Sequence, residues 1–221
     1  MTVLARDAQS GTWRIFERPL EIVTARRVED VLPALAKIEA ECTRNQRYAA
    51  GFLSYEASPA FDSALTTRPP DHFPLLWFGI YGGVRDGSLE DFDAPLPGLA
   101  DEAWTPSVSA ARYADVFERL QELIRNGDTY QVNYTYRLRT RLTSAPFALF
   151  LQLAAAQSPP FGAYVDTGDW MLCSASPELF FHRTGSTLES RPMKGTAARG
   201  LWFEQDLEHA RRLRESEKER A

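Results

Sequence analysis

Four short segments between residues 161 and 191 constrain the fold more than any other feature of this sequence. Each pair of segments flanks a turn that contains glycine: Phe161–Val165 with Trp170–Ser174, and Glu178–Arg183 with Thr187–Arg191. Segments joined in this way are typical of antiparallel hairpins. Since no helix separates the members of a pair, the pattern favours an α+β fold over a doubly wound parallel sheet.

The residues before the hairpins predict two helices with a strand between them. Ser109 can cap a helix whose apolar residues recur at helical spacing until Gly127. Tyr130–Leu142 alternates between apolar and polar residues, which predicts a half-buried strand. A second helix is expected from Pro146 to Gln157.

The N-terminal part predicts a mixture of the same kind. One helix and three strands are expected there: Val28–Arg44 as the helix, and Trp13–Phe16, Tyr48–Tyr55 and Leu75–Val84 as the strands. Glycines and prolines then interrupt every periodicity between Asp86 and Ser109. This loop, 87–108, divides the chain into possible subregions 1–86 and 109–221, although a long surface loop within one domain fits equally well.

Composition excludes several classes of protein. The 221 residues are 44% hydrophobic and 25% charged, which rules out a disordered chain, and a net charge of −5 gives no electrostatic reason to expect a nucleic-acid partner. No apolar run is long enough to span a membrane, and no secretory signal is recognisable. Cys42 and Cys173 form no disulfide framework and are interpreted as core thiols. The expected compartment is therefore the reducing cytoplasm.

The C-terminal residues form a highly charged helical pattern. Glu204–Ala221 contains few apolar positions and no Gly, Asn or Pro to end a helix. Two interpretations stay open: a natural C-terminal helix that frays, or a chain that stops within an element of structure.

The first candidate for chemistry is Lys194, in the sequence R-P-M-K-G-T that directly follows an expected strand. Only 3 of the 25 cationic residues are lysines. Unlike arginine, a desolvated lysine can lose its proton and act as an amine nucleophile. Gly195 allows a ligand to approach the backbone, and Thr196 offers a hydroxyl and an N–H group to a carboxylate. A solvated lysine beside a turn glycine is the simpler alternative.

The second candidate is Glu178, in the sequence S-P-E, sixteen residues before Lys194. Two strands and a turn fill this interval, so one hairpin can bring the carboxyl group and the amine to the same end of a sheet. An acid beside a nucleophilic amine suits displacement of a poor leaving group such as hydroxide. The alternative is a surface ion pair worth about 0–1 kcal/mol.

The sequence gives little support for other kinds of catalytic or binding site. The three histidines, His72, His182 and His209, lie far apart in the sequence without cysteine or acidic neighbours at metal-ligand spacing, so no zinc site is recognisable. The sequence also lacks a glycine-rich phosphate loop and a nucleophile elbow.

Three motifs in order, G-D-T-Y-Q-V-N from Gly127, S-P-E from Ser176 and R-P-M-K-G-T-x-x-R-G from Arg191, resemble the chorismate-utilising enzymes. This family includes anthranilate, isochorismate, salicylate and aminodeoxychorismate synthases. The resemblance runs from about Ser109 to Ala221, and residues 48–65 look like the N-terminal half of the same proteins. At the position of Lys194 the aminodeoxychorismate synthases carry Lys, whereas the other members typically carry Ala.

The resemblance implies a mechanism for amination of chorismate to 4-amino-4-deoxychorismate, the precursor of 4-aminobenzoate and folate. Lys194 would attack C2 while Glu178, as general acid, protonates the departing C4 hydroxyl. Ammonia would then enter at C4 and expel the lysine, and Gly195 and Thr196 would bind the substrate. Two alternatives are an anthranilate or isochorismate synthase and a non-catalytic fragment that acts as a binding or assembly module.

The resemblance also implies a four-layer α/β/β/α sandwich of mostly antiparallel sheets, of which residues 1–221 would be the N-terminal portion of a single chorismate-binding domain, incomplete at its C-terminus. The complete enzymes use Mg²⁺, and the first family magnesium ligand would follow directly after Ala221. This chain alone is therefore expected to bind no metal and to be inactive. The implied partners are a glutamine amidotransferase subunit that supplies ammonia and a fused or separate aminodeoxychorismate lyase.

Overall fold

The computed structural model describes residues 1–69, 71–92, 104–193 and 195–217. Its contacts divide the chain into two compact units, one formed by Met1–Asp93 with Phe150–Ala221 and the other by Ala94–Leu149. The subregions 1–86 and 109–221 expected from the loop do not coincide with these units, because strands from both parts of the chain share one sheet. The assignment of the whole chain to a single domain stays a prediction.

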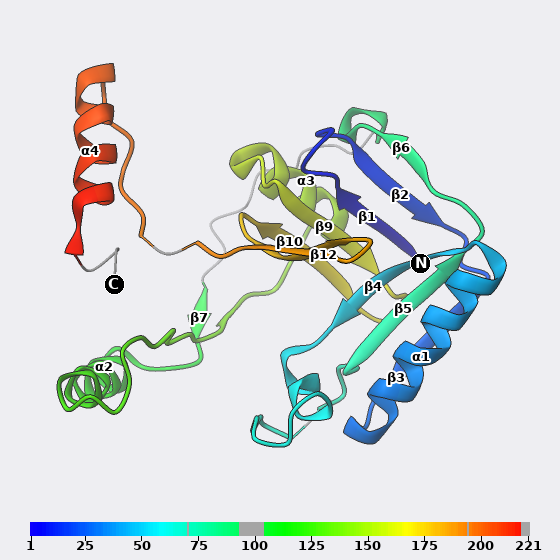
Figure 1. Cartoon of the computed structure of the whole chain (residues 1–221), viewed down its shortest axis with the longest axis horizontal. Coiled ribbons are helices and arrows are strands. Elements are labelled where there is room, and N and C mark those ends of the chain that lie inside the picture. The colour runs from blue at the N-terminus through cyan, green and yellow to red at the C-terminus, as the bar shows by residue number, and fades with distance from the viewer. Residues whose placement is uncertain (70, 93–103, 194, 218–221) are drawn as a thin grey trace. The chain divides into compact units, whose positions relative to one another are not determined.

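A five-stranded antiparallel sheet in the order β10-β9-β1-β2-β6 forms the first layer of the larger unit (Figure 1). Its strands are β1 (Thr2–Arg6), β2 (Trp13–Glu17), β6 (Arg85–Gly87), β9 (Phe161–Asp166) and β10 (Met171–Ser176). Leu4 at the centre of the sheet pairs with Ile15 on one side and with Tyr164 on the other. The β9–β10 hairpin confirms the first expected pair of strands, whereas β1 was not expected from the sequence.

A second antiparallel sheet has the order β3-β5-β4. It consists of β3 (Glu21–Ala25), β5 (Leu76–Tyr81) and β4 (Tyr48–Leu53), with the short helix η1 (Tyr55–Ala60) after β4. Helix α1 (Val28–Asn45) lies along this sheet (Figure 1) and buries Val31, Ala34 and Ile38 against it. The helix and both longer strands were predicted, since each has a strong apolar pattern.

The two sheets pack face to face. Val3, Phe16 and Val165 of the first sheet form one cluster with Trp77 and Tyr81 of the second. Successive residues of a strand point to opposite faces, so the neighbours of these residues point to the other side of the first sheet.

Helix α3 (Pro146–Gln157) covers that other side. Its residue Phe150 contacts Trp13 of β2 and Tyr164 of β9, with ring centroids 5.4 Å apart in both cases. The order is thus helix, sheet, sheet, helix, which confirms the expected α/β/β/α sandwich of antiparallel sheets.

The smaller unit contains α2 (Ala110–Arg125) and a short ladder of β7 (Thr105–Pro106) with β8 (Leu138–Arg139). Ser109 caps the helix as expected, because its Oγ accepts a hydrogen bond from Arg112 N at 3.2 Å.

The strand expected over Tyr130–Leu142 is wrong, since only Leu138 and Arg139 are paired. A strand needs a neighbour for its backbone groups, and the one neighbour that the described residues supply is two residues long and includes a proline, which has no N–H group. The alternation does produce a common face, on which the rings of Tyr134 and Tyr136 lie 5.5 and 5.8 Å from the ring of Tyr113.

The last described elements are β11 (Leu179–Thr184), β12 (Thr187–Arg191) and α4 (Phe203–Glu215). The hairpin of β11 with β12 confirms the second expected pair of strands, and Gly185 in its turn has a φ of 60°, which glycine adopts without steric cost. The helix η2 (Leu89–Asp91) completes the elements of the larger unit. Among the described residues, no helix combines the length and the apolar character that crossing a membrane requires.

Candidate functional site

The β11–β12 hairpin brings Glu178 next to the chain that carries Lys194. Leu179 pairs with Arg191, so the residue before β11 and the residues after β12 leave the same end of the hairpin. There, Met193 N donates a hydrogen bond to Glu178 Oε1 at 3.0 Å. The carboxylate therefore lies beside the backbone of the residue that directly precedes Lys194.

Lys194 itself lies outside the described residues. Of the two residues expected to bind substrate, Gly195 is half-buried and Thr196 is exposed. The hairpin thus brings Glu178 and Met193 together, whereas the roles of Lys194, Glu178, Gly195 and Thr196 stay predictions.

Ser176 fixes the backbone from which the Glu178 side chain extends. Its Oγ accepts a hydrogen bond from Glu178 N at 3.2 Å and donates one to Glu178 O, also at 3.2 Å. Local bonds of this kind stabilise a turn in place of a regular ladder. Glu178 is exposed, so a ligand can reach its carboxyl group.

The segment after Thr196 is tied to α4 by an acidic residue that sequence reasoning did not single out. Asp206 accepts two hydrogen bonds from Arg199 and one from Gly200 N. The bonds from Arg199 and from this amide lower the pKa of Asp206 to about 2. The signal for this contact was present in the sequence, since Arg199 and Gly200 form the R-G part of the quoted motif and a carboxylate follows within the first two turns of the next helix.

The two cysteines are poor candidates for nucleophiles. Both are partly buried, and burial raises the pKa of Cys173, as do burial and the neighbouring Glu41 for Cys42. Because the thiolate is the reactive form of cysteine, these shifts reduce reactivity at neutral pH. The interpretation of both residues as thiols of the core is consistent with this.

The described residues offer no donor set for a metal ion, because no three His, Cys, Asp or Glu side chains among them lie close enough together to hold one. They therefore do not fit the magnesium ion that the resemblance implies. The expectation that the ligands follow Ala221 is untested.

Comparison with protein families gives a match over residues 2–221 to the model of the chorismate binding enzymes. Among curated proteins, anthranilate synthase component 1 of Thermus thermophilus is 36% identical over 131 residues, which is 57% of this chain and 28% of that protein. Aminodeoxychorismate synthase component 1 of Bacillus subtilis is 35% identical over 109 residues, 49% of this chain and 23% of that protein. The protein of the same name from Klebsiella aerogenes is 28% identical over 196 residues, 78% of this chain and 44% of that protein.

Among solved structures, anthranilate synthase component I of Streptococcus pneumoniae TIGR4 matches with a TM-score of 0.73 and 18% identity. The match covers 94% of this chain and 57% of that chain, and at this identity it supports the fold alone. The chain spans less than half the length of the curated relatives named above.

Proposed function

The chain belongs to the family of chorismate binding enzymes, and from this premise we propose that it carries the catalytic lysine and the general acid of an aminodeoxychorismate synthase. Relatives named for amination and for anthranilate synthesis both match. The choice between the two reactions therefore depends on the residues of this chain, and Lys194 is the residue that favours amination.

The observation that carries this proposal is the 3.0 Å hydrogen bond from Met193 N to Glu178 Oε1. It fixes the backbone next to Lys194 beside a carboxyl group, as nucleophilic substitution with acid assistance requires. The bond uses one carboxyl oxygen of Glu178, and we assign the reactive proton to the other.

In the proposed reaction, the neutral amine of Lys194 forms a bond to C2 of chorismate while the C4–O bond breaks. Glu178 gives its proton to the departing hydroxyl, which leaves as water. Ammonia then forms a bond to C4 and the bond from C2 to the lysine nitrogen breaks, which restores the free amine. The proton that ammonia gives up returns to Glu178, so the acid is ready for the next turnover.

We further propose that residues outside this chain bind Mg²⁺ and complete the substrate pocket. A glutamine amidotransferase subunit would supply the ammonia. The 221-residue chain alone is then expected to give no turnover of chorismate. Turnover by the chain alone in buffer with Mg²⁺ and ammonium would contradict this.

Anthranilate synthesis is the second candidate, favoured by the 36% identity to the Thermus thermophilus protein. The products differ in mass, since anthranilate formation also releases pyruvate whereas 4-amino-4-deoxychorismate retains the enolpyruvyl group. Mass spectrometry of the product therefore separates the two candidates directly.

The test uses the natural protein that contains these residues, supplied with chorismate, ammonium and Mg²⁺. We expect 4-amino-4-deoxychorismate from the natural sequence and none from Lys194→Ala. Lys194→Arg should fail as well, because arginine keeps its charge and offers no neutral amine. Lys37→Ala is the matched control and should retain activity, since Lys37 of α1 pairs with Glu21 of β3 and lies far from the hairpin in the sequence. Anthranilate as the product, or an active Lys194→Ala protein, would contradict the proposal.

A further inference from the structure

We propose that Asp206 of α4 is a positioning residue, which holds the segment containing Lys194, Gly195 and Thr196 in place from its C-terminal side. This inference rests on the proposed function, because it concerns the segment that would carry the nucleophile. Asp206 acts through Arg199 and Gly200, and no contact with the substrate is assigned to it.

The Asp206 carboxylate uses both of its oxygens on the segment. Arg199 Nε donates to Oδ1 at 2.8 Å and Arg199 Nη2 donates to Oδ2 at 2.6 Å. Gly200 N also donates to Oδ1, at 2.9 Å. A bidentate guanidinium–carboxylate pair, joined by a hydrogen bond from a backbone amide, fixes the orientation of the two groups as well as their distance.

Gly200 is needed for this contact. A Cβ atom at position 200 would lie 2.2 Å from Asp206 N and 2.7 Å from Asp206 Cα. Because no real Cβ approaches a backbone so closely, a side chain here would push the segment away from the first turn of α4. The sequence therefore provides both the acceptor on the helix and the space that lets the amide reach it.

Two further contacts extend the attachment along α4. Leu201 N donates to Gln205 Oε1 at 2.7 Å, and His209 Nδ1 donates to Ala198 O at 2.7 Å. Residues 205, 206 and 209 lie within about one turn of each other on the helix. Residues 198–201 are thus attached to α4 at four consecutive positions.

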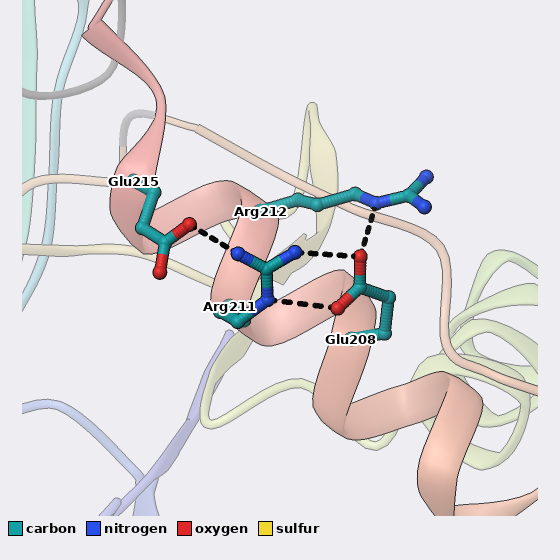
Figure 2. Close-up of polar contacts among 4 residues, drawn as sticks. All are labelled: Glu208, Arg211, Arg212 and Glu215. Carbon is teal, nitrogen blue, oxygen red and sulfur yellow. Dashed lines mark hydrogen bonds and ion pairs between the residues drawn. The ribbon is translucent and has the colours of Figure 1, made fainter.

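The helix that holds the segment is also braced by its own side chains (Figure 2). Glu208 accepts bonds from Arg211 at 2.8 and 2.9 Å and from Arg212 at 2.7 Å, and Arg211 also pairs with Glu215. Bonds between residues three and four positions apart stabilise a helix on its own. None of these four residues donates to or accepts from the segment in the described contacts, so Glu208 provides a matched control.

Two acidic residues therefore accept backbone hydrogen bonds on either side of the segment that contains Lys194. Glu178 accepts from the amide of Met193, directly before Lys194, and Asp206 accepts from the amide of Gly200, six residues after it. Displacement of a reacting group by about 1 Å can lower a rate by about 100-fold. Loss of the second anchor is therefore expected to lower kcat by up to about 100-fold while Lys194 and Glu178 remain.

The first test measures the anchor itself in this chain, by hydrogen exchange of the Gly200 amide followed by NMR. Asp206→Ala should accelerate exchange by about tenfold or more, because the amide loses a charged acceptor. Asp206→Asn keeps an oxygen at that place and should give an intermediate rate. Glu208→Gln, the matched control, should leave the Gly200 amide unchanged. Equal exchange in Asp206→Ala and the natural sequence, with α4 still helical by circular dichroism, would overturn the inference.

The second test measures kcat and KM for amination in the natural protein that contains these residues. We expect kcat to fall in Asp206→Ala and to be intermediate in Asp206→Asn. In Glu208→Gln, kcat should equal that of the natural sequence. Natural kcat in Asp206→Ala would overturn the positioning role and leave the proposed function intact. Absence of amination by the natural sequence would instead overturn the proposed function, and the exchange test would still decide whether Asp206 anchors the segment.

Discussion

The sheets of the larger unit and the segment that carries the candidate site are held together by different forces. In β5, Leu76, Trp77, Ile80 and Tyr81 are all buried, and they pack against α1 and the first sheet. In contrast, β11, β12 and α4 contain no buried residue among those described. Their order comes from hairpin bonds, carboxylate–amide bonds and ion pairs.

Because of this difference, the free energy of unfolding and the proposed reaction should depend on different parts of the molecule. Apolar burial contributes roughly 25 cal/mol per Å² and depends little on pH or salt. Exposed ion pairs contribute about 0–1 kcal/mol each and weaken in salt. Changes in the sheets should therefore lower the free energy of unfolding, and changes around the hairpin should alter the reaction with little effect on unfolding.

The largest effect is expected at Glu178. Glu178→Gln removes the proposed proton donor and should lower kcat for amination by about 10²–10⁴-fold in the natural protein that contains these residues. The free energy of unfolding should change by less than about 1 kcal/mol, because the side chain is exposed. A rate within about twofold of the natural one would exclude Glu178 as the acid.

The next effect is expected in the second sheet. Leu76→Ala removes a fully buried side chain and should lower the free energy of unfolding by about 2–5 kcal/mol, measured with urea. Leu188→Ala, at a β12 residue that is 67% exposed, should change it by less than about 0.5 kcal/mol. Equal losses at the two positions would show that the hairpin is packed as tightly as the sheets.

As the pH falls, the carboxylate contacts of α4 should weaken before the packing of the apolar core changes. Hydrogen bonds from Arg199 and Gly200 lower the pKa of Asp206 to about 2, and bonds from Arg211 and Arg212 lower the pKa of Glu208 to about 2. A carboxylate with a lowered pKa stabilises the folded state above its ordinary pKa, and this stabilisation is lost as the pH falls toward the lowered value. The Gly200 amide shift should therefore titrate with a midpoint near 2, and a midpoint near 4 would show that the anchor is weak.

The smallest effect is expected at Tyr81, in the core between the sheets. Its hydroxyl is buried and has no hydrogen-bond partner among the described residues. Tyr81→Phe should therefore leave the protein equally stable or stabilise it by up to about 1 kcal/mol at pH 8.

The same variant should change the response to alkali. Burial, followed by the charge of Asp166, raises the pKa of Tyr81 to about 12. The stabilisation linked to the neutral phenol is thus complete below about pH 10 and is lost as the pH rises toward 12. Urea unfolding at pH 8 and at pH 11 should show a smaller alkaline loss in Tyr81→Phe than in the natural sequence, and an equal loss would contradict the assignment to Tyr81.

The sequence predicted the elements whose pattern is local. The apolar spacing of α1 and the glycine turns of both hairpins are enough to specify those elements. By comparison, β1 is short and has no alternation, because both of its faces are covered: Val3 packs against the second sheet and Leu4 is buried on the opposite face. It could not be recognised. Tyr130–Leu142 shows the opposite case, since alternation reveals two faces and says nothing about whether a neighbouring strand is available.

The candidate site shows the same contrast between local patterns and contacts that depend on the path of the chain. The proximity of Glu178 to the residues after β12 could be predicted, since a hairpin fixes which residues meet at its open end. The contact of Asp206 with Gly200 was missed, because it depends on the path of residues 195–202, which have no regular structure. Only the R-G sequence marked that path as unusual.

The proposed covalent bond between Lys194 and chorismate can be detected in a tryptic digest. The natural protein that contains these residues is incubated with chorismate and Mg²⁺ without ammonium, quenched and digested. Trypsin does not cleave after a substituted lysine, and Pro192 blocks cleavage after Arg191. A covalent bond at Lys194 predicts a peptide spanning residues 184–199 that is heavier by the mass of chorismate minus water. Complete cleavage after Lys194 under these conditions, in a protein that forms product once ammonium is added, would contradict it.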